Sequence, residues 1–199
     1  MNKINYDDLM QKQINALKGE KPKLLIHSCC APCSSACLER LKDFFKISVL
    51  YYNPNIERQE YYLRKSEQQR FLAQTGWADF IDCDHDESEF LTAVSGLENE
   101  PEGGARCAVC FKLRLKKTRD VAEELGYEYF ATTLTVSPLK NATVLNAVGE
   151  KLQTQKIKWL YSDFKKRGGY LKSCELAKKY ELYRQNYCGC VFSKKKVEK

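Results

Sequence analysis

Short apolar runs alternate along the chain with longer polar or amphipathic stretches. The apolar runs are bounded by polar or turn-forming residues, a pattern that is typical of buried strands. They predict five strands at about residues 23–28, 47–53, 77–82, 127–134 and 157–162. The stretches between them predict helices at about residues 34–42, 57–74, 87–96, 141–153 and 170–183, with a further helix from about residue 107.

This alternation predicts the fold class. Apolar strands separated by helices imply right-handed βαβ crossovers, and therefore a mostly parallel five-stranded sheet in an α/β fold. We expect a single domain over residues 1–199, with residues 1–22 as a polar N-terminal helical extension and residues 191–199 as a basic C-terminal tail. Ligands of such sheets bind beyond the carboxyl ends of the strands. The residues found at the predicted strand ends are Cys29, Cys30, Asn53, Cys83, Asp84, Thr132, Thr133 and Asp163.

Composition narrows the class of protein. The 199 residues are 43% hydrophobic and include 12 tyrosines, which indicates a folded chain. The longest apolar run falls short of the ~18 residues that a membrane helix needs, and residues 1–23 lack the apolar core of a signal peptide. We therefore expect a cytoplasmic protein with no membrane partner, whose thiols stay reduced.

Positive charge is concentrated in two stretches. The formal net charge is +7, and the excess lies mainly in residues 112–119 and 151–172. The cations that we predict to contact RNA are Lys112, Lys116, Lys117, Lys165, Lys166 and Arg167. Such patches suit a polyanion, of which a nucleic-acid backbone is the usual one. A solvated helix face explains them equally well, and no RNP, zinc-finger or helix-turn-helix signature decides between the two interpretations.

The grouping of the cysteines is the main chemical feature of this sequence. Seven of the ten cysteines fall into three tight groups, namely Cys29, Cys30 and Cys33; Cys107 and Cys110; and Cys188 and Cys190. Paired thiols on short spacers from distant segments are typical of a soft-metal or iron–sulfur site. The other three cysteines, Cys37, Cys83 and Cys174, are predicted to be small buried residues.

The cysteine spacings leave alternatives open. Cys30 and Cys33 form a CxxC pair at a strand-to-helix turn, which is also a thioredoxin-like redox signature. The Cys188–Cys190 pair could be half of a structural zinc site. Neighbouring side chains point apart in an extended segment, so we expect Cys29 and Cys30 to serve two adjacent centres. There is no Walker loop and no GxGxxG, which disfavours ATP or NAD binding.

The motifs in combination resemble a known family. HSCCAPC, YYNPNI followed by YYLR, EPEGGARCAVC with LRL, TTLTVSP, DFKKRGGY and YRQNYCGC, in this order along residues 24–191, resemble the QueH family of epoxyqueuosine reductases. The resemblance implies reduction of epoxyqueuosine to queuosine at the wobble position of tRNA, without cobalamin. It also implies a Rossmann-like, adenine-nucleotide-hydrolase-like α/β fold and a [4Fe–4S] cluster beside a second metal, which is iron, or zinc in aerobic preparations.

The expected partners follow from this resemblance, whereas the division of the cysteines follows from the expectation that Cys29 and Cys30 serve two adjacent centres. Our prediction puts Cys30, Cys107, Cys110 and Cys188 on the cluster, and Cys29, Cys33 and Cys190 on the second metal. The predicted proton donors near the strand ends are Asp163, Tyr52 and Tyr187. The substrate would be a tRNA with a queuosine-type anticodon, whose unpaired bases could stack on Tyr52, Tyr61 or Tyr62. An electron donor that the sequence does not identify would complete the reaction.

Two other classes of function remain open at this point. A thiol–disulfide oxidoreductase using Cys30 and Cys33 would be colourless and independent of iron. A zinc-stabilised RNA-binding module would hold zinc tightly and carry no redox chemistry. A tRNA-thiolating enzyme is disfavoured because the ATP loop is missing.

Overall fold

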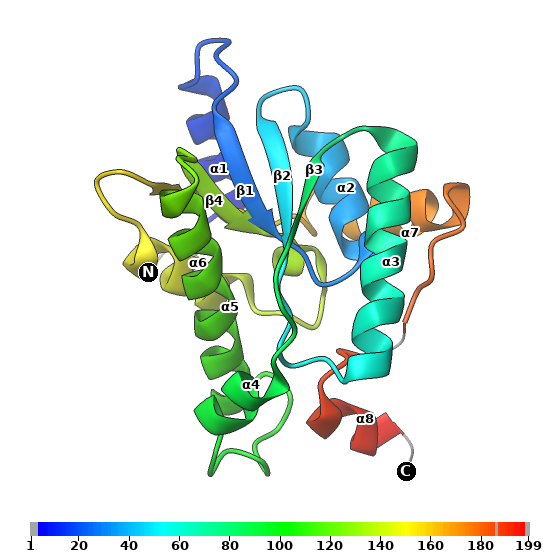
Figure 1. Ribbon diagram of the computed structural model, residues 1–199. Helices are drawn as coiled ribbons and strands as arrows, with labels where there is room; N and C mark the ends of the chain where they lie inside the picture. Colours follow the sequence, from blue (N-terminus) through cyan, green and yellow to red (C-terminus); the bar gives the residue numbers. More distant parts are fainter. Residues whose placement is uncertain (1–3, 186, 198–199) are drawn as a thin grey trace.

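The computed structural model describes residues 4–185 and 187–197 (Figure 1). Its strands are all parallel and form one sheet in the order β3-β2-β1-β4-β5. They are β1 (Lys23–His27), β2 (Lys46–Tyr51), β3 (Asp79–Asp82), β4 (Tyr129–Thr132) and β5 (Lys158–Trp159). The predicted α/β class and the five-stranded parallel sheet are confirmed.

Helices cover both faces of the sheet (Figure 1). The α-helices are α1 (Tyr6–Asn15), α2 (Ala31–Leu41), α3 (Arg58–Thr75), α4 (Glu87–Ala93), α5 (Ala105–Glu124), α6 (Ala142–Leu152), α7 (Gly169–Lys179) and α8 (Val191–Val197). A 3₁₀ helix, η1 (Thr133–Val136), follows β4 directly.

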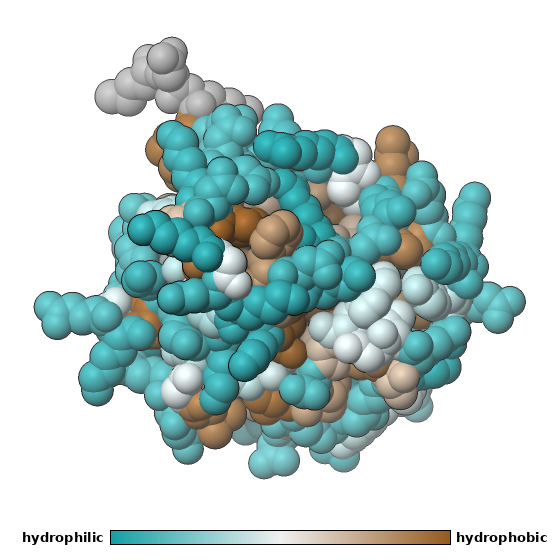
Figure 2. All heavy atoms as spheres, turned by 90° about the horizontal axis from the view of Figure 1, so that it is seen from above, coloured by the Kyte–Doolittle hydropathy of each residue, from teal (hydrophilic) through white to brown (hydrophobic). Residues whose placement is uncertain are grey.

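Side-chain alternation along β1 divides the core into two layers. Leu24 and Ile26 pack into an apolar cluster with residues of α1, α2, α3 and α7, whereas Leu25 packs on the other face with residues of α5 and α6. This is the period of two expected for a strand that is buried on both faces. The face at which the strands begin is largely hydrophilic, with apolar residues in small separate patches (Figure 2). Both apolar faces of the sheet are therefore covered by its own helices.

Some predicted boundaries differ from the structure. Helix α2 begins at Ala31, three residues earlier than expected, because Pro32 suits the first turn of a helix. Cys33 therefore lies inside this helix, and Cys30 is its N-cap residue. Strand β5 comprises only Lys158–Trp159 of the predicted residues 157–162.

Both predicted terminal segments contain helices that contact the core. In α1, Tyr6, Met10 and Ile14 are buried. The segment predicted to be a basic tail contains α8, in which Phe192 packs near Phe90 at a ring separation of 6.3 Å. Residues 1–3 and 198–199 of these two segments lie outside the described residues. Along the described chain we find no helix with the length and apolar character needed to cross a bilayer.

The strand order fixes where a ligand site should lie. The chain moves outward from β1 to β2 and β3, and then returns to the other side of β1 for β4 and β5. The crossovers from β1 and from β4 therefore leave in opposite directions, and a crevice opens beyond the carboxyl ends of these two strands. The CCAPC segment directly follows β1 and η1 directly follows β4, so both border this crevice.

Candidate metal centre and substrate cavity

A buried histidine closes the carboxyl end of β1. His27 Nδ1 lies 3.0 Å from Thr132 Oγ1, and Nε2 lies 3.1 Å from the Tyr52 carbonyl oxygen. Burial, and after it the charge of Arg114, lowers the pKa of His27 to about 3, so the imidazole is neutral. His27 thus links the ends of β1, β2 and β4 and supports the segment that carries the first thiols.

The first three thiols lie together at the start of α2. Their sulfur atoms are all within 4.8 Å of one another, and the Sγ atoms of Cys29 and Cys30 are 3.9 Å apart. Two thiolates on one tetrahedral zinc ion would lie about 3.8 Å apart, given Zn–S bonds of ~2.3 Å. The chain bends at Cys29 after β1 has ended, so the alternation of an extended strand does not apply here. Cys29 and Cys30 can therefore share one ion, contrary to the geometric expectation from the sequence.

Hydrogen bonds among these thiols shift their pKa values in opposite directions. Hydrogen bonds from the thiols of Cys29 and Cys33 hold the pKa of Cys30 well below its usual range. The hydrogen bonds of Cys33 with Cys29 and Cys30 raise the pKa of Cys33. Cys30 is therefore the thiol of this group whose pKa its neighbours lower.

A second group of thiols surrounds a small cavity beside the first group. The group consists of Cys107, Cys110, Cys188 and Cys190. The first two lie on one face of α5, and the backbone N–H of Gly103 donates to Cys107 Sγ at 3.2 Å. Cys190 pairs with Ile56 in an isolated antiparallel bridge, which brings the C-terminal segment beside the loop after β2.

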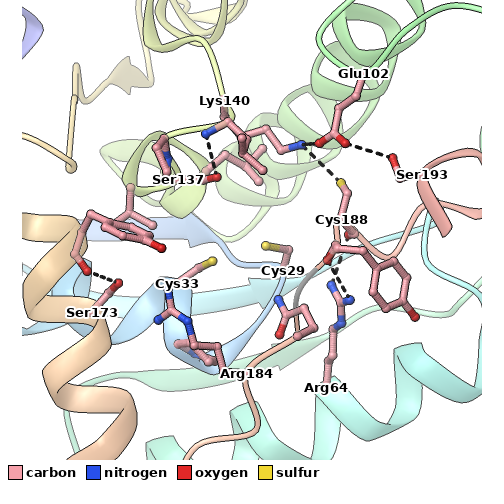
Figure 3. Close-up of a pocket in the computed structure, with 18 of the residues that line it drawn as sticks. Cys29, Cys33, Arg64, Glu102, Ser137, Lys140, Ser173, Arg184, Cys188 and Ser193 are labelled. Atoms are coloured by element: carbon pink, nitrogen blue, oxygen red, sulfur yellow. Dashed lines mark hydrogen bonds and ion pairs between the residues drawn. The ribbon is translucent and has the colours of Figure 1, made fainter. Parts of the chain in front are cut away.

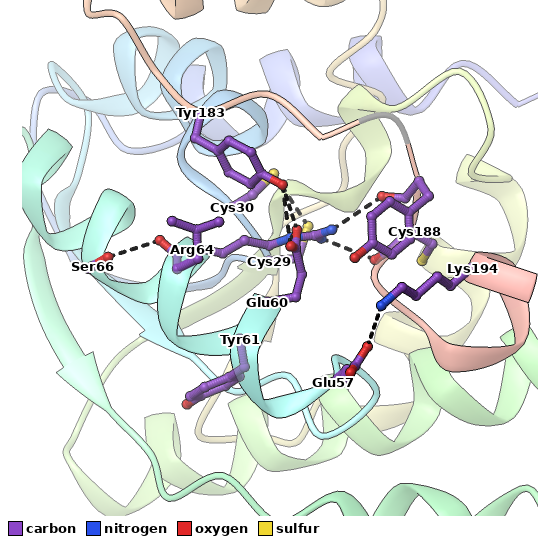
Figure 4. A network of polar contacts seen from close by, with 12 residues as sticks. Cys29, Cys30, Glu57, Glu60, Tyr61, Arg64, Ser66, Tyr183, Cys188 and Lys194 are labelled. Carbon is purple, nitrogen blue, oxygen red and sulfur yellow. Dashed lines mark hydrogen bonds and ion pairs between the residues drawn. The ribbon is translucent and has the colours of Figure 1, made fainter. Parts of the chain in front are cut away.

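Arg64 fixes the segment that carries Cys188 and Cys190 (Figure 4). This α3 side chain is only 1% exposed, and its Nη atoms donate to the carbonyl oxygens of Cys188 and Tyr187 at 3.2 and 3.4 Å. Its Nε donates to Glu60 at 2.6 Å. Gly189 has a φ of +87°, and a Cβ there would lie 2.9 Å from Arg64 Nη1. The glycine of the CGC motif is required both by this left-handed conformation and by the packed guanidinium.

A larger cavity of about 630 Å³ opens against both thiol groups (Figure 3). Its lining includes Cys29, Cys33 and Cys188. The cationic side chains that line it, among the described residues, are Arg64, Arg114, Lys140 and Arg184. This volume lies within the range of about 300–1,000 Å³ that is usual for small-molecule sites.

The cations beside the thiols test whether the site suits an anionic metal centre. Lys140 Nζ donates to Glu102 at 2.8 Å and to Cys188 Sγ at 3.4 Å. Arg114 is 1% exposed, and no carboxylate of the described residues lies within 4.0 Å of its guanidinium. Burial lowers the pKa of Arg114, but the thiols of Cys110, Cys188 and Cys29 outweigh this effect and raise it. An unpaired buried charge is costly, so Arg114 fits a site whose thiols are ionised, as metal-bound thiols are.

The predicted proton donors are separated in the structure. Tyr187 lines the larger cavity. Tyr52 is buried, and its hydroxyl donates to the Glu89 carboxylate. Asp163 lines neither cavity, and its carboxylate accepts from Lys165 at 2.7 Å. Only Tyr187 of the three therefore stands in the cavity wall.

The predicted RNA-binding cations lie in two places. Lys112, Lys116 and Lys117 are exposed on α5, where Lys116 pairs with Asp120 at 2.8 Å. In the second stretch Lys166 is exposed, whereas Lys165 pairs with Asp163 and Arg167 pairs with Asp7. The α5 group thus offers more uncommitted positive charge than the second stretch.

Sequence reasoning missed the four cations of the larger cavity. One signal could have found Arg114: it lies four residues after Cys110 and seven after Cys107, and therefore on the same face of α5. Arg64, Lys140 and Arg184 come from separate segments, and no spacing in the sequence connects them.

The fold and the site together define a class: an α/β protein that gathers thiols, three of which could hold a metal ion, and buried cations at the topological switch point of its sheet. Residues 24–196 match the family described as Epoxyqueuosine reductase QueH. The chain is 46% identical, over 97% of its length and 79% of the relative, to the epoxyqueuosine reductase QueH of Streptococcus pyogenes serotype M1. It is 42% identical to the protein of that name from Staphylococcus epidermidis (96% of this chain, 85% of the relative) and 32% identical to that from Thermotoga maritima (85% and 89%). The chain belongs to the QueH family of epoxyqueuosine reductases, and is an oxidoreductase.

Proposed function

We propose that this chain reduces epoxyqueuosine in tRNA to queuosine in the cytoplasm, with a [4Fe–4S] cluster and an adjacent metal ion. The observation that carries the proposal is the gathering of seven thiols, from three distant parts of the chain, beside two neighbouring cavities at the switch point of the sheet. Membership of the family supplies the substrate. It also disfavours a non-enzymatic zinc module, because the named relatives are reductases.

The reaction defines what the site must supply. The epoxide accepts two electrons and two protons, both C–O bonds to the oxygen break, a C=C double bond forms, and the oxygen leaves as water. When bound, the cluster supplies electrons one at a time, and the adjacent ion supplies a Lewis acid for the oxygen. The electrons come from a donor that remains to be identified.

The residues of the chain position this chemistry. Arg64 holds the Cys188 segment in place, and Lys140 donates a hydrogen bond to the Cys188 sulfur. A hydrogen bond to a ligating sulfur tunes the potential of a cluster. Tyr187 is the proton donor that the geometry favours, because it lines the cavity beside Cys188, whereas the roles predicted for Tyr52 and Asp163 remain predictions.

We further propose a division of the seven thiols that differs from the sequence prediction. The cluster would be held by Cys107, Cys110, Cys188 and Cys190, which line one small cavity. The adjacent ion would be held by Cys29, Cys30 and Cys33, whose sulfurs lie within 4.8 Å of one another. The two divisions differ only in exchanging Cys30 and Cys190.

The function is tested by anaerobic purification, quantification of iron and sulfide, and a dithionite-driven assay on tRNA that contains epoxyqueuosine. We expect about four sulfides and more than four irons per chain, together with turnover to queuosine. Colourless protein that turns over without iron would favour the Cys30–Cys33 dithiol alternative, and colourless protein that holds only zinc and does not turn over would favour the zinc-stabilised RNA-binding module.

The division of thiols is tested by the spectra of two serine variants. Cys190→Ser should bleach the broad iron–sulfur absorbance, whereas Cys30→Ser should keep it and lose activity. The reverse pattern would restore the division predicted from the sequence. Cys174→Ser, on α7 and outside both cavities, serves as the matched control and should change neither property.

A further inference from the structure

A tyrosine–arginine pair stands in the wall of the larger cavity. Tyr170 is the second residue of α7, and Arg184 lies on the segment that leads to the last thiols. The guanidinium carbon of Arg184 lies 5.3 Å from the centre of the Tyr170 ring. Figure 3 shows Arg184 in the same cavity as Cys33 and Cys29. The pair therefore offers a flat, positively charged surface close to the thiols.

Arg184 is the least committed of the cations that line this cavity. Arg64 is paired with Glu60, Lys140 with Glu102, and Arg114 is buried among the thiols. Arg184 is exposed and has no carboxylate of the described residues within 4.0 Å. The contact of Arg184 within the described part of the chain is with the Tyr170 ring, so the other face of its guanidinium is available to a ligand.

The next residue adds a buried polar atom that lacks a partner. Gln185 lines the same cavity, and its side chain hydrogen-bonds to Cys30. Its Oε1 atom is buried and has no hydrogen-bond partner among the described residues. A buried acceptor without a donor is unfavourable in the empty protein, so it indicates a ligand that brings an N–H group.

We propose that Arg184 and Gln185 bind the nucleobase of the substrate in this cavity. The base stacks on the outer face of the Arg184 guanidinium, which Tyr170 supports from behind, and an N–H of the base donates to Gln185 Oε1. Unpaired RNA bases are commonly bound by stacking on arginine planes and by hydrogen bonds to their edges. Arg184 is the contacting residue and Tyr170 is a positioning residue. The inference rests on the proposed function, since it assumes that the substrate is a nucleotide of tRNA.

This inference replaces the tyrosines that the sequence suggested for stacking. Tyr52 and Tyr61 are 3% and 1% exposed, which leaves no ring face for a base. Tyr62 is 53% exposed but lies outside the lining of the cavity. The exposed ring of Tyr62 is therefore useful as a control.

The test is a double-mutant cycle between the protein and the RNA. Anaerobically purified full-length protein is titrated with two anticodon hairpins, one carrying guanine at the wobble position and one abasic there. The wild type should bind the guanine hairpin more tightly, by about fivefold to thirtyfold. Arg184→Ala should abolish this preference, and Arg184→Lys, which keeps the charge but not the plane, should restore little of it. Tyr170→Phe should retain the preference and Tyr170→Ala should lose part of it, whereas Tyr62→Ala should leave it unchanged.

Each outcome has a distinct meaning. If Arg184→Ala weakens both hairpins equally, the arginine does not contact the base and the inference is overturned, while the proposed function stands. If the wild type binds both hairpins alike, the base does not enter the cavity. The inference is then overturned, while the proposed function again stands. If the wild type binds neither hairpin, both the inference and the tRNA substrate are rejected. An unchanged visible spectrum in every variant shows that the thiol site is intact.

Discussion

Replacing Arg64 with methionine would remove the guanidinium that holds the Cys188 segment against α3. The change deletes the hydrogen bonds to the Cys188 and Tyr187 carbonyl oxygens and leaves the Glu60 carboxylate without its cation. Removing one partner of a buried ion pair costs about 3–5 kcal/mol. The Glu60 side chain is 11% exposed and keeps a contact with the Tyr183 hydroxyl at 3.3 Å. We therefore expect a loss near the lower limit of that range, about 3 kcal/mol.

The same helix provides a matched control. Arg70 also pairs with a glutamate, Glu67, and also donates to two backbone carbonyl oxygens, those of Tyr180 and Glu181. Its side chain is 45% exposed, however, so water can replace these contacts. Exposed pairs contribute about 0–1 kcal/mol, and Arg70→Met should cost no more than that.

Urea unfolding of the metal-free proteins, followed by tryptophan fluorescence, measures both losses. Iron and sulfide content after anaerobic reconstitution then shows whether the thiol site survives. We expect Arg64→Met to hold less iron than the wild type, because Cys188 and Cys190 are no longer positioned, and Arg70→Met to load normally. Equal free energies of unfolding for the two variants, or full iron loading by Arg64→Met, would show that Arg64 does not hold this segment.

Three further changes test other parts of the structure. Lys140→Met removes the N–H donor to the Cys188 sulfur, so the cluster should become harder to reduce. The reduction potential should fall by about 60 mV if the hydrogen bond is stronger by about 1.4 kcal/mol in the reduced state. An unchanged potential in a redox titration would argue against the contact. Gly149→Ala should destabilise the protein by about 1–3 kcal/mol, because the new methyl group would overlap the buried ring of Trp159. Helix propensity alone predicts the opposite, a gain of about 1 kcal/mol. Thermal unfolding decides between the two expectations. Glutamate at both Lys116 and Lys117 should weaken tRNA binding and reduce its salt dependence, and unchanged affinity would make this face of α5 merely solvated.

The sequence predicted the sheet well because its strands are apolar on both faces and lie between helices. Strand β1 illustrates this, since Leu24, Leu25 and Ile26 are all fully buried. Strand β5 was predicted too long because an apolar run cannot show how many of its residues find a hydrogen-bonding neighbour. Helix α8 was missed because its lysines dominate the composition, whereas its place depends on Phe192 and the bridge at Cys190.

For the site, residue type was more informative than spacing. Thiols are rare and reactive, so the seven cysteines could be selected from the sequence, and the structure brings them to one edge of the sheet. Their division between a cluster and an ion stays a prediction, because it depends on the bend at Cys29, which no motif specifies. The arginines of the cavity were missed for a different reason. In the sequence, Arg64 and Arg184 resemble ordinary surface charges, because only the tertiary structure buries Arg64 and places Arg184 near an aromatic ring.

The place of Cys188 and Cys190 in the chain has a consequence for biogenesis. Both follow β5, the last strand of the sheet, and contacts such as those of Arg64 and the bridge to Ile56 bring them to the site. During synthesis the sheet can form, with Cys29, Cys30 and Cys33 already in position, before the final thiols leave the ribosome. On the proposed function, the metal centre can therefore be completed only after these last thiols arrive. Until then, Cys29, Cys30 and Cys33 lack the neighbours that the end of the chain supplies.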